Sequence, residues 1–134
     1  ITSMWTLTIS PRFGDTDALG HINNTVLPVW FEEGRTPVFR MFTPDLNPQD
    51  WHLIIAKIEV EYLGELFYGR DIELRTYIQK LGNSSMTIAH EAWQDGKLGA
   101  KGCAIMVHFD HDAKKSVAIP DSIREQLIPH LQTL

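Results

Sequence analysis

The chain has 134 residues, of which 43% are hydrophobic, and this length and composition predict one globular domain over residues 1–134. Its formal net charge of -5 argues against a nucleic-acid partner, because such binding depends on clustered Lys and Arg that neutralise phosphates. No stretch reaches the roughly 20 apolar residues that span a bilayer, and no basic-then-apolar signal pattern opens the sequence, so we expect a soluble protein without a membrane partner.

The chain contains a single cysteine, Cys103, which lies in an apolar run. One cysteine cannot form a disulfide within the chain, and this fits a protein of the reducing cytoplasm. We expect Cys103 to be a small buried hydrophobic residue.

The first predicted strand is residues 5–10, where apolar and polar residues alternate. A dense polar cluster follows at residues 15–24, directly before an apolar segment that predicts a helix. Two carboxylates, a histidine and two carboxamides thus stand beside a helix start, where backbone amides and the helix dipole favour developing negative charge. The sequence therefore predicts that this junction carries chemistry, with a carboxylate as nucleophile or base.

Residues 26–42 predict the main helix, with Thr25 as its cap and Pro28 in the first turn, where a missing N–H is tolerated. Its large apolar side chains are too numerous for an exposed helix: Trp30, Phe31, Val38, Phe39 and Phe42. Pro37 removes one backbone hydrogen bond, so we expect a helix that is kinked or split near residues 34–36.

Four later segments alternate with the two-residue period of a half-buried strand. Their repeating residues are Ala56, Ile58, Val60 and Tyr62; Ile72, Leu74, Thr76 and Ile78; Met86, Ile88, His90 and Ala92; and Cys103, Ile105, Val107 and Phe109. Short turn-like separators make sequential antiparallel pairing, a meander, the simplest topology. Residues 120–131, with the capping pattern Ser122 to Glu125, predict a closing helix. One apolar helix and about five antiparallel strands predict an α+β fold in which the sheet curls around the helix.

Several motifs carry a resemblance to a known family. They are Asp15-x-Asp17-x-x-Gly20-His21-x-Asn23-Asn24, Phe31-Glu32-Glu33-Gly34-Arg35, Glu61-Tyr62-Leu63, Gly69-Arg70-Asp71, residues 81–85 and Ile119-Pro120. Together they resemble the hot-dog-fold acyl-CoA thioesterases of the 4-hydroxybenzoyl-CoA thioesterase type over nearly the whole chain. The resemblance implies a sheet wrapped around one long, here kinked, helix. It also implies a homodimer or homotetramer with its site at the subunit interface, and an acyl-CoA or acyl-carrier-protein thioester as substrate.

Position by position, the resemblance places the family's catalytic aspartate at Asp17, which would attack the thioester carbonyl or activate water. It places the oxyanion donor at the backbone amide near Asn24, with His21 and Asn23 orienting the thioester or the water. A carboxylate suffices for this chemistry because a thiolate is a good leaving group. The chain departs from the family at Leu27, where many relatives have tyrosine.

The candidate substrate-binding residues are Gly20, Glu33, Ser84 and Ser85. Glu33 has an alternative interpretation as an acid that complements the helix dipole and pairs with Arg35 or with another segment, and the two serines as turn residues. Asp15 is expected to be a turn or capping carboxylate, and His90 a core or interface residue.

We expect neither a metal nor a cofactor. The string that begins at Asp15 imitates a calcium loop, but Leu19 and Val26 occupy positions that require oxygen ligands. Residues 110–112 follow a strand and precede two lysines, which is typical of a solvated turn, and no paired-cysteine or HExxH spacing supports zinc.

The sequence thus predicts an acyl-CoA thioesterase that releases a carboxylic acid and CoA. Two alternatives stay open: a non-catalytic module that binds acyl-CoA or an acyl-carrier protein, and a hot-dog hydratase or dehydratase that acts on the acyl chain.

Overall fold

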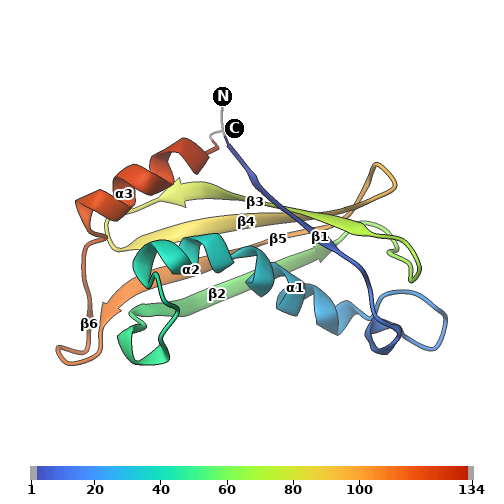
Figure 1. The fold of residues 1–134 in the computed structure, drawn as a ribbon, viewed down its shortest axis with the longest axis horizontal. Helices are drawn as coiled ribbons and strands as arrows, with labels where there is room; N and C mark the ends of the chain where they lie inside the picture. Colours follow the sequence, from blue (N-terminus) through green and yellow to red (C-terminus); the bar gives the residue numbers. More distant parts are fainter. Residues whose placement is uncertain (1–2, 133–134) are drawn as a thin grey trace.

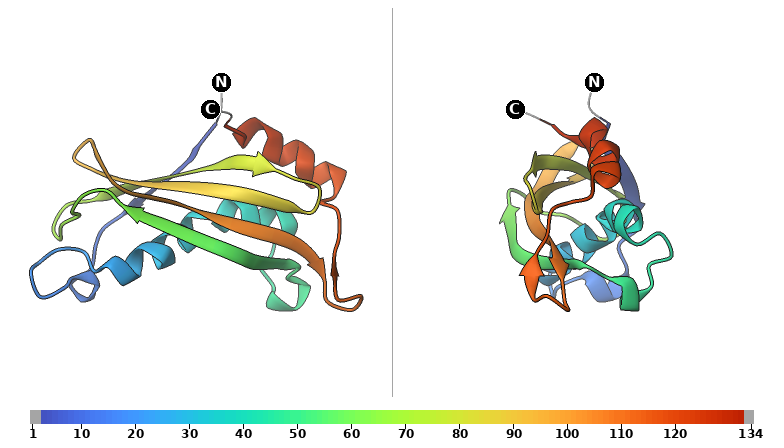
Figure 2. Two further views of the ribbon diagram at one scale, coloured as in Figure 1. Left: turned by 180° about the vertical axis from the view of Figure 1, so that it is seen from behind. Right: turned by 90° about the vertical axis from the view of Figure 1, so that its left-hand side faces the viewer.

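The computed structural model describes residues 3–132, in which an antiparallel sheet curls around a layer of helices (Figures 1 and 2). The strands are β1 (Trp5–Ile9), β2 (Leu53–Tyr62), β3 (Ile72–Leu81), β4 (Ser85–Gln94), β5 (Lys97–Asp110) and β6 (Lys115–Ser116). The helices are α1 (Leu27–Gly34), α2 (Thr36–Phe42) and α3 (Asp121–Leu127), and short 3₁₀ turns cover Phe13–Asp15, Asn24–Val26, Pro48–Asp50 and Ile128–His130. The predicted α+β fold, a curled sheet around a kinked helix, is confirmed.

The strand order is β1-β3-β4-β5-β2, with the short β6 paired to β5. The meander is confirmed for β3, β4 and β5, but the predicted pairing of β2 with β3 is wrong, because β2 pairs with β5 at the far edge and β1 lies beside β3. The connection at residues 63–71 is long enough to carry the chain across the sheet, so these consecutive strands need not be neighbours.

The buried face of β5 also differs from the prediction. Ala104 and Met106 are buried. Cys103 and Ile105, which the alternation predicts to face the core, are only partly buried. Pairing explains this phase: Ile88 and Met86 of β4 lie opposite Ala104 and Met106, and paired residues share one face of a sheet. Cys103 is accordingly a half-buried residue on the other face.

The main helix breaks where Pro37 predicts it, because α1 ends at Gly34 and α2 begins at Thr36. Its beginning differs from the prediction. The 3₁₀ turn before α1 is capped by Asn23, whose side chain accepts a hydrogen bond from the Thr25 amide, so Thr25 is not the cap. The closing helix α3 has Pro120 at its N-cap and no side-chain capping bond, so the predicted capping box at Ser122 is wrong.

The face of the sheet toward α1 and α2 forms the core, which includes the fully buried Phe31, Leu74 and Ile88. Strand β2 departs from its predicted half-burial, since only Leu53 among its ten residues is buried. It pairs on one side only, and a β-bulge between Ile55 and Lys57 interrupts its alternation. No helix within residues 3–132 is long and apolar enough to span a membrane.

Candidate functional site

The loop that precedes α1 is organised around the carboxylate of Asp17. Its Oδ1 accepts hydrogen bonds from the backbone amides of Leu19 (2.8 Å) and His21 (3.1 Å), while the Asp17 amide donates to the His21 carbonyl (2.8 Å). Gly20 closes this turn with a φ of 82°, which a residue with a side chain rarely adopts. Asp17 is exposed, and its Oδ2 has no hydrogen-bond donor in the part of the chain described, so one carboxylate oxygen is held and the other faces outward.

Asp15 lies two residues away but is buried. The Arg12 amide donates to Asp15 Oδ2 at 2.8 Å, and the Arg12 guanidinium approaches Oδ1 at 3.2 Å. Burial raises the pKa of Asp15, but the hydrogen bonds and positive charge of Arg12 outweigh it and hold the pKa below its ordinary value. Asp15 is therefore the capping carboxylate that the sequence predicts.

The His21 ring lies between the loop and the segment after β2. Its Nε2 is 3.5 Å from Glu65 Oε2, and the ring meets Phe67 edge-on, with 5.2 Å between ring centroids. The next amide, that of Ile22, donates to the Leu66 carbonyl at 2.8 Å. These contacts set the orientation of the imidazole beside the Asp17 turn.

The two asparagines form the start of the helical segment. Asn23 Oδ1 accepts from the Thr25 amide (3.0 Å) and hydroxyl (2.9 Å), and Tyr62 of β2 donates its hydroxyl to the Asn24 carbonyl at 2.6 Å. The Asn24 amide has no acceptor among the described residues. A free amide at a helical N-terminus is a suitable donor for a developing oxyanion.

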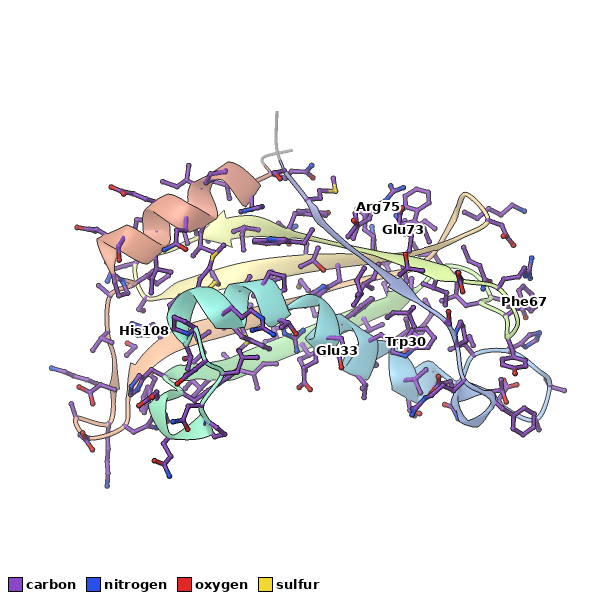
Figure 3. The ribbon with its side chains drawn as sticks, in the orientation of Figure 1. Trp30, Glu33, Phe67, Glu73, Arg75 and His108 are labelled. Atoms are coloured by element: carbon purple, nitrogen blue, oxygen red, sulfur yellow. The ribbon has the colours of Figure 1, made fainter. Side chains whose placement is uncertain are left out.

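The structure brings five predicted site residues together at one end of the molecule: Asp17, Gly20, His21, Asn23 and Asn24. Figure 3 shows Phe67 at this end, and Glu33 further along the helix, in the last turn of α1. Ser84 and Ser85 lie at the β3–β4 turn, at the opposite end of the molecule (Figure 1). Their carbonyls accept hydrogen bonds from the amides of His108 (2.8 Å) and Gly82 (2.8 Å), respectively, so the two serines support turn structure.

Sequence reasoning missed three residues that support this end of the molecule, namely Tyr62, Glu65 and Gln94. The side chain of Gln94 is buried and bonds the Phe67 amide (2.9 Å) and the Phe67 and Arg70 carbonyls (2.9 and 3.1 Å). Gln94 continues the inward series of β4, so a polar residue in that phase was the available signal. Nothing local in the sequence connects Tyr62 with Asn24.

A second group of polar residues lies in the core at the helix break. Arg35 is 2% exposed, and its Nη1 is 3.3 Å from Nε2 of the buried His90. His90 Nδ1 is 3.0 Å from Thr76 Oγ1, and the Phe31 ring stacks on the imidazole at 4.9 Å. Burial, aided by the charge of Arg35, lowers the pKa of His90 to about 3. His90 is therefore the satisfied core residue that the sequence predicts.

A cavity of about 460 Å³ lies beside Arg35, between the helix break and strands β2 and β5. Its lining residues are Glu32, Glu33, Arg35, Thr36, Phe39, Trp51, Leu53, Ile55 and Met106. Metal-binding geometry is absent from residues 3–132, where no three His, Cys, Asp or Glu side chains are grouped to hold an ion.

A curled antiparallel sheet around a helix is the hot-dog fold of thioesterases, which this chain shares with a solved thioesterase structure. Residues 11–127 match the thioesterase-like superfamily, and the chain belongs to that family. The structure of a predicted thioesterase from Bacillus stearothermophilus is 43% identical, with a TM-score of 0.94 over 98% of this chain and 99% of that one.

Two further proteins are more distant. A thioesterase from Thermus thermophilus, solved with coenzyme A and zinc, is 30% identical, with a TM-score of 0.80 over 91% of this chain and 90% of that one. An uncharacterized Bacillus subtilis (strain 168) protein, YsmA, is 25% identical over 90% of this chain and 82% of its own length.

Proposed function

We propose that this protein hydrolyses acyl-CoA thioesters to a carboxylic acid and CoA, as enzymes of the 4-hydroxybenzoyl-CoA thioesterase type do. The observation that carries the proposal is the Asp17 turn. One carboxylate oxygen accepts hydrogen bonds from two backbone amides, and the other accepts none from the described residues. The Asn24 amide, which has no acceptor among residues 3–132, supports the proposal, because nucleophile or base and oxyanion donor then belong to one loop.

The chemistry follows from these groups. Asp17 Oδ2 either attacks the thioester carbonyl carbon or removes a proton from a water that does so. In both routes the carbonyl electrons move onto oxygen, the Asn24 amide stabilises the negative charge, and the C–S bond breaks to release the CoA thiolate. His21 and Asn23 orient the thioester or the water. In the nucleophilic route, water then hydrolyses the acyl-aspartate anhydride and regenerates Asp17.

Coenzyme A has several phosphates, so its binding calls for cations near this end of the molecule. Arg70 and Lys97 line a cavity of about 310 Å³ that also includes Glu65 and Phe67, which contact His21. Arg70 pairs with Asp95 and lies over the Phe67 ring. This placement supports CoA binding beside the Asp17 loop.

The proposed enzyme is a homodimer or homotetramer built through β2. This ten-residue strand has an unpaired edge and exposes large apolar side chains, including Ile55 (45%), Ile58 (46%) and Tyr62 (51%). A long apolar edge favours pairing with another strand. Ile58→Lys should shift the sedimentation coefficient toward the monomer, whereas Ile128→Lys, at a 53% exposed position away from β2, should not.

Thiol release from a panel of short, medium, long and aryl acyl-CoAs tests the activity. Asp17→Asn should lower kcat about 100-fold or more, because the amide keeps the oxygen that holds the turn but is neither a base nor a nucleophile. Asp45→Asn is the matched control, since the exposed Asp45 Oδ1 also accepts a backbone amide, that of Asn47 at 3.1 Å, in a turn away from this loop. Full activity of Asp17→Asn would refute the proposed role. Calorimetric acyl-CoA binding without thiol release would favour a binding module, and enoyl formation with the thioester intact a hydratase.

A further inference from the structure

Arg35 is buried at the break between α1 and α2, as the last residue before α2 begins. The Arg35 amide donates to the Glu32 carbonyl at 3.0 Å, and its carbonyl accepts the amides of Val38 (2.9 Å) and Phe39 (3.0 Å). These bonds fix the backbone on both sides of Pro37. The side chain is consequently directed into the interior between helix and sheet, where it is 2% exposed.

The buried guanidinium has no anionic partner within residues 3–132. Its one side-chain hydrogen bond is to His90 Nε2 at 3.3 Å, and the guanidinium can only donate, so Nε2 accepts and Nδ1 carries the proton toward Thr76. His90 is thus neutral. Arg35 Nε is buried and makes no hydrogen bond in the described structure, and Glu32, whose negative charge acts on Arg35 from a distance, forms no ion pair with it.

An uncompensated buried charge is expensive, and arginine cannot lose its proton to avoid that cost. The arrangement around Arg35 therefore favours any carboxylate that reaches it. Arg35 forms part of the wall of the cavity of about 460 Å³, within the size range of small-molecule sites. The rest of the wall includes Phe39, Trp51 and Met106, which suit the hydrocarbon part of an acyl group.

We propose, on the basis of the proposed thioesterase function, that Arg35 makes this protein selective for acyl groups that end in a second carboxylate. In this binding mode the thioester carbon lies at the Asp17 loop, the acyl chain runs along α1 to the apolar wall of the cavity, which no residue of the loop lines, and the distal carboxylate pairs with the guanidinium. Asn24 and Arg35 are separated by 11 positions, roughly 16 Å along a helix at about 1.5 Å per residue, so within one protomer the acyl group is long.

Two acids on the same cavity wall do not cancel this preference. Glu32 and Glu33 are exposed, so water and salt screen their charges, whereas the charge of Arg35 acts through the interior of the protein and is screened much less. The binding free energy of a dicarboxylyl group therefore comes mainly from its contact with the buried guanidinium rather than from repulsion by the exposed acids. A charge-assisted hydrogen bond of this kind is also stronger than one to a neutral ester.

The test compares dicarboxylyl-CoAs of increasing length with the methyl esters of the same acyl groups. In the wild type, kcat/KM for the longer carboxylates should exceed that for their esters by about 10-fold or more, the scale of one hydrogen bond between charged groups. Arg35→Met should reduce that ratio to about one, and Arg35→Lys should retain part of it. Arg40→Met is the control, because it removes an exposed arginine of α2 that does not line this cavity and should leave the ratio unchanged.

Comparing carboxylate and ester substrates with the wild-type protein tests the inference even if an Arg35 variant fails to fold. Equal rates for carboxylate and ester at every length, or the same ratio in Arg35→Met as in the wild type, would overturn the inference while leaving thioesterase activity established. Binding supplies a readout that needs no hydrolysis: long free dicarboxylic acids should bind the wild type in calorimetry about 10-fold more tightly than their monomethyl esters. Equal affinity would overturn the inference even for a protein that cleaves no thioester.

Discussion

The loop at residues 12–24 and the interior around Arg35 hold polar side chains in opposite ways. In the loop, the backbone does the positioning: amides of Leu19 and His21 hold Asp17, which stays exposed. In the interior, side chains hold one another: Arg35, His90 and Thr76 form a buried chain of hydrogen bonds. Substitution of the exposed Asp17 should therefore change chemistry at little cost in stability, while substitutions in the interior should lower stability first.

Replacement of His90 should produce the largest loss of stability. His90→Leu leaves the buried Arg35 without its acceptor and Thr76 without its partner, so we expect the free energy of unfolding at neutral pH to fall by about 3 kcal/mol. Denaturant titration measures this change. His52→Leu, at an exposed position, is the control and should alter stability little. Equal stabilities for the two variants would show that the hydrogen bonds among Arg35, His90 and Thr76 contribute nothing to stability.

The same residue should make the protein sensitive to acid. The pKa of His90 is about 3 in the folded protein and near 6.5 in an unfolded chain, so between these values only the unfolded chain binds the proton. The free energy of unfolding must then fall as the pH decreases from about 6.5 toward 3. Denaturant titrations across this range should show the wild type losing its advantage over His90→Leu. A constant difference would contradict neutral burial of His90.

Gly34 lies at the end of α1, against the buried Thr76 and His90. Its substitution should lower stability less than the replacement of His90. A Cβ at this position would lie 2.7 Å from Thr76 Oγ1 and 2.8 Å from Leu74 Cδ2. We expect Gly34→Ala to lower the free energy of unfolding by about 2 kcal/mol, although alanine normally stabilises a helix. Gly14→Ala is the control, because no described atom beyond Gly14 and its two chain neighbours lies within 4 Å of the Cβ position. Stabilisation by Gly34→Ala would mean that the helix packs less closely than described.

The sequence predicted the features that depend on nearby residues and missed those that depend on long-range contacts. Local patterns sufficed for the inward phase of β3 and β4, the break at Pro37 and the crowding of polar groups before α1, since each depends on neighbours in the chain. The position of β2 beside β5 and the phase of β5 depend on long-range pairing, and both predictions were wrong. Arg35 and His90 are 55 residues apart, so no periodicity connects them.

The polar residues of the loop could be predicted as a group, but the residues that orient them could not. The polar types at Asp17, His21 and Asn24 indicated a site, and the fold brings them together as their proximity in sequence requires. The partners that orient them, Glu65 and Tyr62, come from the end of β2 and the segment after it, whose approach depends on the strand order. The thioesterase role of the assembled residues stays a prediction until Asp17 is replaced.

The smallest expected effect on stability separates two aspartates within the loop. Asp15→Asn removes the charge that pairs with Arg12 and should lower the free energy of unfolding by about 1 kcal/mol, with kcat of the folded enzyme nearly unchanged. Because the pKa of Asp15 is lowered in the folded protein, this stabilisation is present at neutral pH and is lost as the pH falls below the ordinary carboxyl range. Asp17→Asn should do the reverse, with a large loss of kcat and little loss of stability. Parallel kinetics and denaturation of the two variants measure this division, and an equal loss of kcat in both would show that the loop acts as one unit rather than through Asp17.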